Sequence, residues 1–119
     1  MGPSEIDLDI VVPVFNEEQR LGATLRALTA HTATLPLGVR ITVVDNGSVD
    51  RTAEVVDEAA GRSPANTAVR LIGCSRQGKG AAVRRGLLAG TARWRGFCDA
   101  DLSTPPQVCL LYTSDAADE

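Results

Sequence analysis

The sequence contains few aromatic residues, one histidine and no long apolar run. Phe, Trp and Tyr make up 3% of its 119 residues, which argues against an aromatic platform that stacks single-stranded nucleic acid. No segment approaches the roughly 18 apolar residues of a membrane-spanning helix. His31 is not arranged with a serine or cysteine as a catalytic pair, so nucleophilic hydrolysis has no support. These absences leave a globular chain of the size of one domain.

The cysteines are too few and too scattered for a small disulfide-bonded or zinc-binding protein. Cys74, Cys98 and Cys109 are odd in number and form no CxxC pair. We therefore expect no disulfide framework and no structural zinc, as is typical of proteins in a reducing compartment.

Acidic and basic residues are segregated along the chain. Residues 1–58 carry ten acids and four bases, whereas residues 59–98 carry eight bases and no acid. The formal net charge is −3, and the acidic first half weakens the case for a nucleic acid partner. A basic block just before the acidic pair Asp99 and Asp101 fits a phosphorylated ligand together with a cation. Solvated arginines on helix faces are the alternative.

Strand-like and helix-like segments alternate along the chain. Short apolar runs rich in β-branched residues predict buried parallel strands at residues 10–15, 39–44, 68–73 and 94–98. Apolar residues at helical spacing predict a helix in each gap, with Val83 and Leu87 of the third facing inward. This order predicts an α/β fold, a mostly parallel sheet with helices on both faces.

Polar clusters follow the strand ends. Asn16 is expected to cap the first helix, with Gln19 in capping-box spacing, and Ser48 or Asp50 to cap the second. In parallel sheets of this kind, ligands bind beyond the carboxyl ends of the strands. Ordinary loops explain any one cluster, but four at one edge predict a ligand site, and they lie at residues 16–17, 45–48, 76–80 and 99–101.

The last two clusters have the chemistry of a diphosphate site. Asp99 and Asp101, two residues apart at a strand end, can share a hard divalent cation that bridges phosphates and stabilises a leaving diphosphate. Arg76 and Lys79 flank a glycine-rich start of a helix, where amides and positive charge suit a diphosphate. The segment is neither a P-loop nor GxGxxG, which disfavours a nucleoside triphosphatase or a dinucleotide-dependent dehydrogenase.

The first two clusters fit the nucleoside end of such a ligand. Asp45 can accept hydrogen bonds from a base or ribose, and Gly47 permits close approach of the backbone. Pro13 stiffens the end of the first strand, and Glu17 can reach a ribose or base. Turn chemistry and a helix cap are the alternative interpretation of these residues.

Four motifs in this order resemble the inverting family 2 glycosyltransferases with the GT-A fold, and they read VVPVFNEE, VVDNGSVDRT, RQGKGAAVRRG and CDADLSTPP. The resemblance covers residues 6–106 and is greatest to the polyprenol-phosphate branch, the dolichyl-phosphate glucosyl- and mannosyltransferases and their bacterial relatives. The strings GKGAAVRRG and DADLSTP favour the glucosyltransferase-like side.

The resemblance implies transfer of a sugar from a UDP-glucose-like or GDP-mannose-like donor to a polyprenol-phosphate acceptor, with inversion and with Mg²⁺ or Mn²⁺. The candidate nucleotide-sugar-binding residues are Pro13, Asn16, Glu17, Asp45, Gly47, Arg76, Lys79 and Asp99. The candidate metal ligands are Asp99 and Asp101, while Ser103 stands where related transferases often have glutamine. No catalytic base is assigned, because the acceptor's phosphate oxygen is already a nucleophile.

Residues 1–108 are expected to be the incomplete nucleotide-sugar-binding part of a GT-A domain. Residues 109–119 resemble a translated sequencing adapter and are expected to be an artefactual tail. We therefore expect weak or no transferase activity from this chain alone, and a full-length protein in the cytoplasm or at the cytoplasmic face of a membrane. A sugar-phosphate nucleotidyltransferase and a non-enzymatic α/β nucleotide-binding module are the alternatives.

Overall fold

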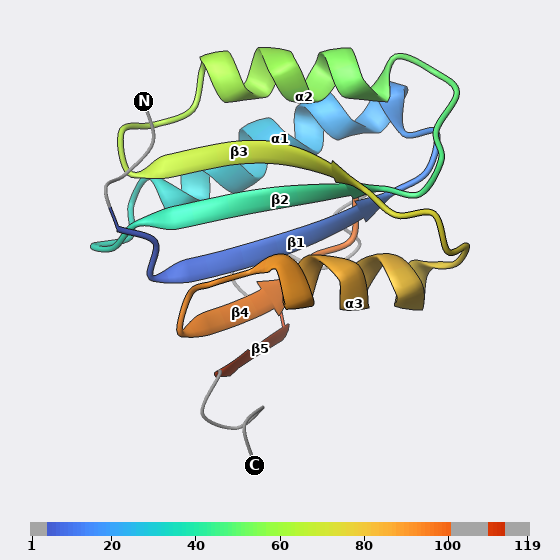
Figure 1. Ribbon diagram of the computed structural model, residues 1–119. Helices are drawn as coiled ribbons and strands as arrows, with labels where there is room; N and C mark the ends of the chain where they lie inside the picture. The colour runs from blue at the N-terminus through green and yellow to red at the C-terminus, as the bar shows by residue number, and fades with distance from the viewer. Residues whose placement is uncertain (1–4, 101–109, 114–119) are drawn as a thin grey trace.

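A five-stranded sheet in the order β3-β2-β1-β4-β5 forms the centre of the fold (Figure 1). The computed structural model describes residues 5–100 and 110–113. Its elements are β1 (Leu8–Val14), α1 (Glu18–Thr32), β2 (Val39–Asp45), α2 (Thr52–Gly61), β3 (Thr67–Gly73), α3 (Lys79–Ala89), β4 (Trp94–Phe97) and β5 (Leu110–Thr113). The four predicted strands and three predicted helices are confirmed, and every strand end lies within two residues of its predicted position.

The first four strands run parallel, with β1 between β2 and β4 and with β3 outside β2. Helices α1 and α2 cover one face of the sheet and α3 lies on the other (Figure 1). The predicted α/β class with helices on both faces is therefore confirmed. The direction in which strands are added to the sheet reverses at β1. The chain adds β2 and β3 on one side of β1 and then adds β4 on the other side.

The larger core cluster lies between the sheet and helices α1 and α2. Leu21, Leu25 and Leu28 are fully buried there, as their helical spacing predicts. The smaller cluster, under α3, is built from Val11, Val44 and Ala82, with Leu87 only partly buried beside it. In the described part of the chain, no helix is both long and apolar enough to cross a bilayer.

The face of helix α3 that contacts the sheet is made of small residues. Ala82 and Gly86 are its buried residues, whereas Val83 and Leu87, which were expected to face inward, are half-buried at its sides. A Cβ atom on Gly86 would lie 2.5 Å from Cγ1 of Val11 and 2.9 Å from Cγ2 of Val44. Such distances are below van der Waals contact, so the position has room for glycine alone.

A buried carboxylate connects the start of the sheet to the loop before β4. Asp9 is 1% exposed, and its oxygens accept hydrogen bonds from Nε and Nη2 of Arg40 and from the backbone N–H groups of Thr91 and Ala92. Burial alone raises the pKa of Asp9, but the Arg40 side chain, the Ala92 amide and the Arg40 charge together hold that pKa below its ordinary value. Asp9 is therefore a fully partnered anion in the core.

Residues 110–113, which belong to the segment expected to be a tail, form β5, antiparallel to β4. One expectation needs correction. Cys98 is disulfide-bonded, contrary to the expectation from cysteine number, while Cys74 is free. The division of the chain at residue 108 stays a prediction.

Candidate functional site

A cavity of about 270 Å³ opens beyond the carboxyl ends of β1 and β4, beside the first residue of α3. It is lined by Pro13, Val14, Phe15, Glu17, Arg20, Asn46, Lys79, Ala82, Asp99 and Ala100. The position coincides with the point where the strand order changes side at β1. Open α/β sheets bind ligands in the crevice at such a point.

The charged side chains of the cavity form two opposite pairs. Glu17 accepts hydrogen bonds from Nε and Nη2 of Arg20, the shorter at 2.6 Å. Lys79 forms an ion pair with Asp99, which comes directly after β4 and Cys98. Because Lys79 is also the first residue of α3, its charge adds to the positive end of the helix dipole. The cavity thus presents separate positive and negative groups to a ligand.

Asn46 joins the loop after β2 to the loop before α3. Its Nδ2 donates to the backbone carbonyl of Arg76 at 2.8 Å, and its Oδ1 accepts from the backbone N–H of Gly78 at 3.0 Å. Gly78 has φ +110°, a conformation that favours glycine. This bridge fixes the backbone from which Lys79 projects into the cavity.

Asn16 joins the loop after β1 to the loop after β2. Its backbone N–H donates to Oγ of Ser48 at 2.8 Å, and its Oδ1 accepts from the N–H of Val49 at 2.9 Å. The predicted capping box is wrong, because Glu17 occupies the N-cap position of α1 without a side-chain cap. Asn16 itself has φ +51°, which turns its side chain toward the neighbouring loop.

Asp50 connects the starts of the first two helices. Its Oδ2 accepts from the backbone N–H of Glu18 at 3.2 Å, and its Oδ1 accepts from the backbone N–H and hydroxyl of Thr52. The Thr52 hydroxyl is the main cause that holds the pKa of Asp50 below its ordinary value. Asp50 therefore serves both α1 and α2, although the N-cap position of α2 is Arg51.

The structure brings half of the predicted nucleotide-sugar residues into the cavity. Pro13, Glu17, Lys79 and Asp99 line it, while the other four lie outside its lining. Those four are Asn16, Asp45, Gly47 and Arg76. The predicted metal ligand Asp101 lies outside the described residues.

Three of the residues outside the lining have local structural partners. Oδ1 of Asp45 accepts from the N–H of Ser48 at 2.9 Å and closes its own turn. Gly47, with φ +91°, supplies the left-handed residue of that turn. Arg76 is held through its carbonyl by Asn46, and its side chain lines a neighbouring hollow on α3. The interpretation of residues 45–48 as turn chemistry accounts for these contacts.

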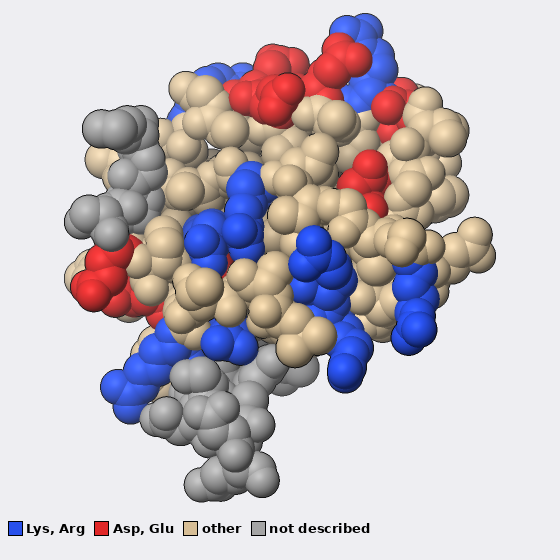
Figure 2. All heavy atoms as spheres, viewed as in Figure 1, with Lys and Arg blue, Asp and Glu red and all other residues tan. Residues whose placement is uncertain are grey.

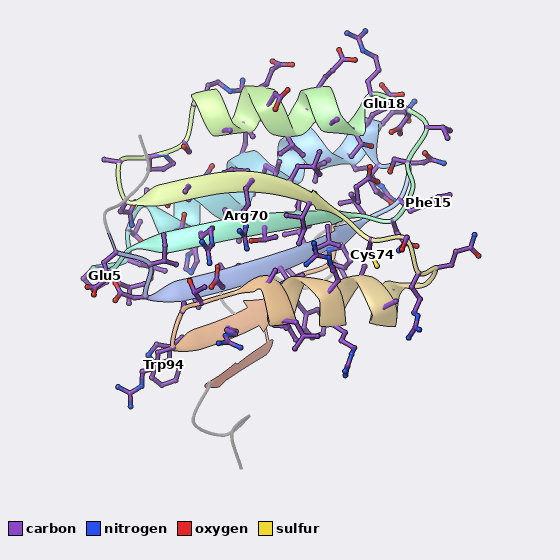
Figure 3. The ribbon with its side chains drawn as sticks, in the orientation of Figure 1. Glu5, Phe15, Glu18, Arg70, Cys74 and Trp94 are labelled. Carbon is purple, nitrogen blue, oxygen red and sulfur yellow. The ribbon has the colours of Figure 1, made fainter. Side chains whose placement is uncertain are left out.

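Sequence reasoning assigned no role to Phe15, Arg20 or Asn46, which all line the cavity. Phe15 is 57% exposed, and Figure 3 shows it at the end of the sheet opposite Trp94. Phe15 follows directly after a fully buried strand, and an apolar ring exposed at such a position indicates a ligand contact. This signal can be used only when the end of the strand is known. Arg20 follows Glu17 by three residues, the spacing at which helical side chains meet.

The described residues contain no group of three or more potential metal-ligating side chains. Asp99 supplies one carboxylate inside the cavity, and Mg²⁺ and similar cations are often held by one or two carboxylates plus substrate phosphates. The donor set therefore fits a cation that arrives together with a diphosphate ligand.

The model of the family described as "Glycosyl transferase family 2" matches residues 9–119, nearly the whole chain. The chain belongs to glycosyl transferase family 2. The membership agrees with the predicted resemblance and favours it over the nucleotidyltransferase and the non-enzymatic module. The cavity of this family 2 chain lies at the carboxyl edge of its parallel strands.

Relatives of the family 2 chain include transferases named for lipid phosphates. An undecaprenyl-phosphate 4-deoxy-4-formamido-L-arabinose transferase of Pseudomonas aeruginosa is 39% identical over 112 residues, which cover 90% of this chain and 32% of the relative. A dodecaprenyl-phosphate galacturonate synthase of Rhizobium johnstonii is 31% identical, with coverage of 86% and 30%. The chain thus spans about a third of the length of these relatives.

Solved structures share the fold. A mannosyltransferase from Pyrobaculum calidifontis in complex with GDP-Man and Mn²⁺ superposes with a TM-score of 0.69 at 26% identity, covering 84% of this chain and 29% of that one. A glucosyl-3-phosphoglycerate synthase from Mycobacterium tuberculosis in complex with UDP gives 0.65 at 22% identity, covering 83% and 35%. The second likeness, at its low identity, shows the GT-A fold alone.

Proposed function

We propose that the protein to which this chain belongs transfers a sugar from a nucleoside-diphosphate donor to a polyprenyl phosphate, with inversion and with a divalent cation. The observation that carries the proposal is the pairing of Lys79 with Asp99 in a cavity at the carboxyl edge of the sheet. A ligand that brings a diphosphate and a cation together offers each member of this pair a new partner of opposite charge.

The cavity residues divide into a phosphate end and a nucleoside end. Lys79 donates to the diphosphate with the help of the α3 dipole. Phe15 offers an exposed ring on which a base stacks, and Glu17 accepts from a ribose hydroxyl. The donor proposed here is UDP-glucose-like or GDP-mannose-like.

Asp99, together with Asp101 beyond the described residues, would hold Mg²⁺ or Mn²⁺. When bound, the cation neutralises charge on the departing nucleoside diphosphate. Asp99 has a second role within this chain, because its ion pair positions the Lys79 ammonium in the cavity. The solved mannosyltransferase of the same fold was obtained with Mn²⁺ and GDP-Man, which supports this assignment.

The acceptor proposal is supported by the relatives named for undecaprenyl and dodecaprenyl phosphates. A phosphate oxygen of such an acceptor attacks the anomeric carbon while the bond from that carbon to the diphosphate oxygen breaks, so one displacement inverts the centre. The acceptor oxygen is anionic already and needs no strong base. We place this reaction in the cytoplasm or at the cytoplasmic face of a membrane, and expect weak or no transfer by the 119-residue chain alone.

The proposal is tested by calorimetry of the purified chain with UDP-glucose, GDP-mannose and UDP-N-acetylglucosamine, each with and without MnCl₂. We expect one donor to bind in a Mn²⁺-dependent manner, and Asp99→Asn to weaken that binding by at least about tenfold. Asp57→Asn, the same change on the exposed surface of α2, serves as the control. Equal binding by the Asp99 variant and the parent, or no binding of any donor by the parent, contradicts the proposal.

The role of Phe15 gives a separate prediction. Phe15→Ala should weaken binding of the preferred donor by about 5- to 150-fold, because base–aromatic stacking contributes about 1–3 kcal/mol per base. Trp94→Ala is the matched control, since Trp94 is also exposed but lies at the opposite end of the sheet (Figure 3). The melting temperature of both variants should stay near that of the parent. A donor affinity that is lowered equally by the two substitutions would argue against stacking on Phe15.

A further inference from the structure

The face of the molecule that carries α3 is strongly basic. Four arginines form what we call the basic face, and they are Arg70, Arg76, Arg84 and Arg85. Figure 2 shows Lys and Arg spread over α3 and the neighbouring strands, and Asp and Glu gathered along α2 at the top. The molecule is therefore electrically polarised although its formal net charge is only −3.

The positive charge of the basic face is not neutralised locally. Among the residues that the structure describes, none of the four arginines forms an ion pair. Desolvation, followed by the nearby charge of Arg40, lowers the pKa of Arg70, and the carboxylate of Asp9, which opposes this effect, is already bound to Arg40. The face is thus short of negative charge and fits an anionic partner.

Apolar surface lies within the same face. Leu88 of α3 is 68% exposed and borders hollows of about 560 and 530 Å³ on the two sides of the helix, with Arg84 lining both. The first hollow is otherwise lined mainly by apolar side chains, which are Val83, Leu87 and Phe97. Arginines around an exposed leucine on one helix are typical of a surface that lies on an anionic bilayer.

The first hollow is continuous with the candidate site. Lys79 lines both this hollow and the cavity beyond β1 and β4. A bilayer against the basic face would therefore lie next to the place where the donor is proposed to bind. A nucleic acid partner would match the arginines but would leave Leu88 and the apolar hollow unused.

We propose that the basic face docks on the phosphate headgroups of an anionic lipid bilayer, with Leu88 directed toward the membrane. The inference rests on the proposed function, because a polyprenyl phosphate is held in a membrane and must reach the donor there. The four arginines give the attraction and orientation, and the acidic surface of α2 is turned away from the lipid.

The test is co-sedimentation of the 119-residue chain with vesicles of equal parts phosphatidylglycerol and phosphatidylcholine, and with vesicles of phosphatidylcholine alone. We expect binding to the anionic vesicles only, lost at high salt. Arg84→Glu with Arg85→Glu should lower the affinity by about 30-fold or more, since each basic residue near an anionic surface contributes about a factor of five. Leu88→Ser should weaken binding further without changing its salt dependence.

Arg26→Glu with Arg62→Glu, the same charge change on exposed positions of α1 and the end of α2, is the control and should bind the vesicles more strongly than the α3 variant. Three results would overturn the docking proposal. They are no binding of the parent chain to anionic vesicles, an equal loss of vesicle affinity in the two double variants, and binding of the chain to heparin but not to vesicles. Donor calorimetry on the α3 variant separates the two proposals. If the α3 variant still binds the donor but no longer binds vesicles, docking through the basic face is supported. If the parent chain binds vesicles but no donor, only the proposed function is contradicted.

Discussion

Replacing Asp9 with asparagine is expected to lower the free energy of unfolding by about 3–5 kcal/mol, the largest single effect we predict. Asp9 is buried and accepts four hydrogen bonds, two from Arg40 and two from the backbone of Thr91 and Ala92. An amide of the same shape places an NH₂ group against some of these donors and leaves the Arg40 charge without its counter-ion. Chemical denaturation followed by circular dichroism measures the loss.

Asp57→Asn is the control for this substitution, because it makes the same chemical change on the exposed side of α2. The control should change the free energy of unfolding by less than about 0.5 kcal/mol. If the two variants unfold at the same denaturant concentration, the network around Asp9 has no net stabilising effect and the prediction is wrong.

The same carboxylate makes the stability depend on pH. The pKa of Asp9 is lower in the folded chain than its ordinary value of 3.8, because the hydrogen bonds and charge of Arg40 outweigh the effect of burial. A carboxyl with a lowered pKa stabilises the fold above its unfolded-state pKa, and this contribution is lost as the pH falls through the folded-state pKa. We therefore expect the melting temperature to fall below about pH 4, and to fall less steeply in the Asp9→Asn variant.

Gly86→Ala is expected to destabilise the fold by about 1–3 kcal/mol, the cost typical of overpacking a core. The added methyl group would lie 2.5 and 2.8 Å from the two γ-carbons of Val11 and 2.9 Å from Cγ2 of Val44. These atoms belong to the two central strands, so relief of the clash requires α3 to move away from the sheet. Because α3 begins at Lys79, the same shift should also weaken binding of the nucleotide donor.

Gly80→Ala, on the same helix, is the matched control, because a Cβ there meets no atom within 4 Å. Alanine is the better helix former by about 0.5–1 kcal/mol, so this variant should unfold at the same or a higher denaturant concentration than the parent. Both glycines gain the same helix propensity, and the difference between the two variants therefore isolates the clash at Gly86. Equal stability of the two variants would show that α3 tolerates a larger separation from the sheet.

The fold could be predicted because its signals are local. Each parallel strand is a short apolar run, and Leu21, Leu25 and Leu28 announce the buried side of α1 through spacing alone. The sequence did not reveal which side of α3 meets the sheet. Val83 and Leu87 are the larger residues, but Val11 and Val44 fill the space beneath the helix and leave room only for Ala82 and Gly86.

The candidate site was predicted at the level of its loops and only partly at the level of side chains. Lys79 and Asp99 meet as expected, because both follow directly from the ends of regular elements. Asn16 and Asp45 do not reach the cavity, since the left-handed backbone at Asn16 and the tight turn after Asp45 direct their oxygens to neighbouring N–H groups. Turn geometry of this kind depends on contacts between loops about thirty residues apart, which a linear pattern does not display.

The hydrogen-bond partners of Asp9 lie far apart in the sequence and are therefore synthesised at very different times. Arg40 follows Asp9 by 31 residues, whereas Thr91 and Ala92 follow it by 82 and 83. During translation β1 can therefore pair with β2 and neutralise its carboxylate through Arg40 while β4 has not yet been made. The two amides and strand β4 are added later, on the other side of β1. Until β4 is in place, the central strand of the nascent chain is paired along one edge only.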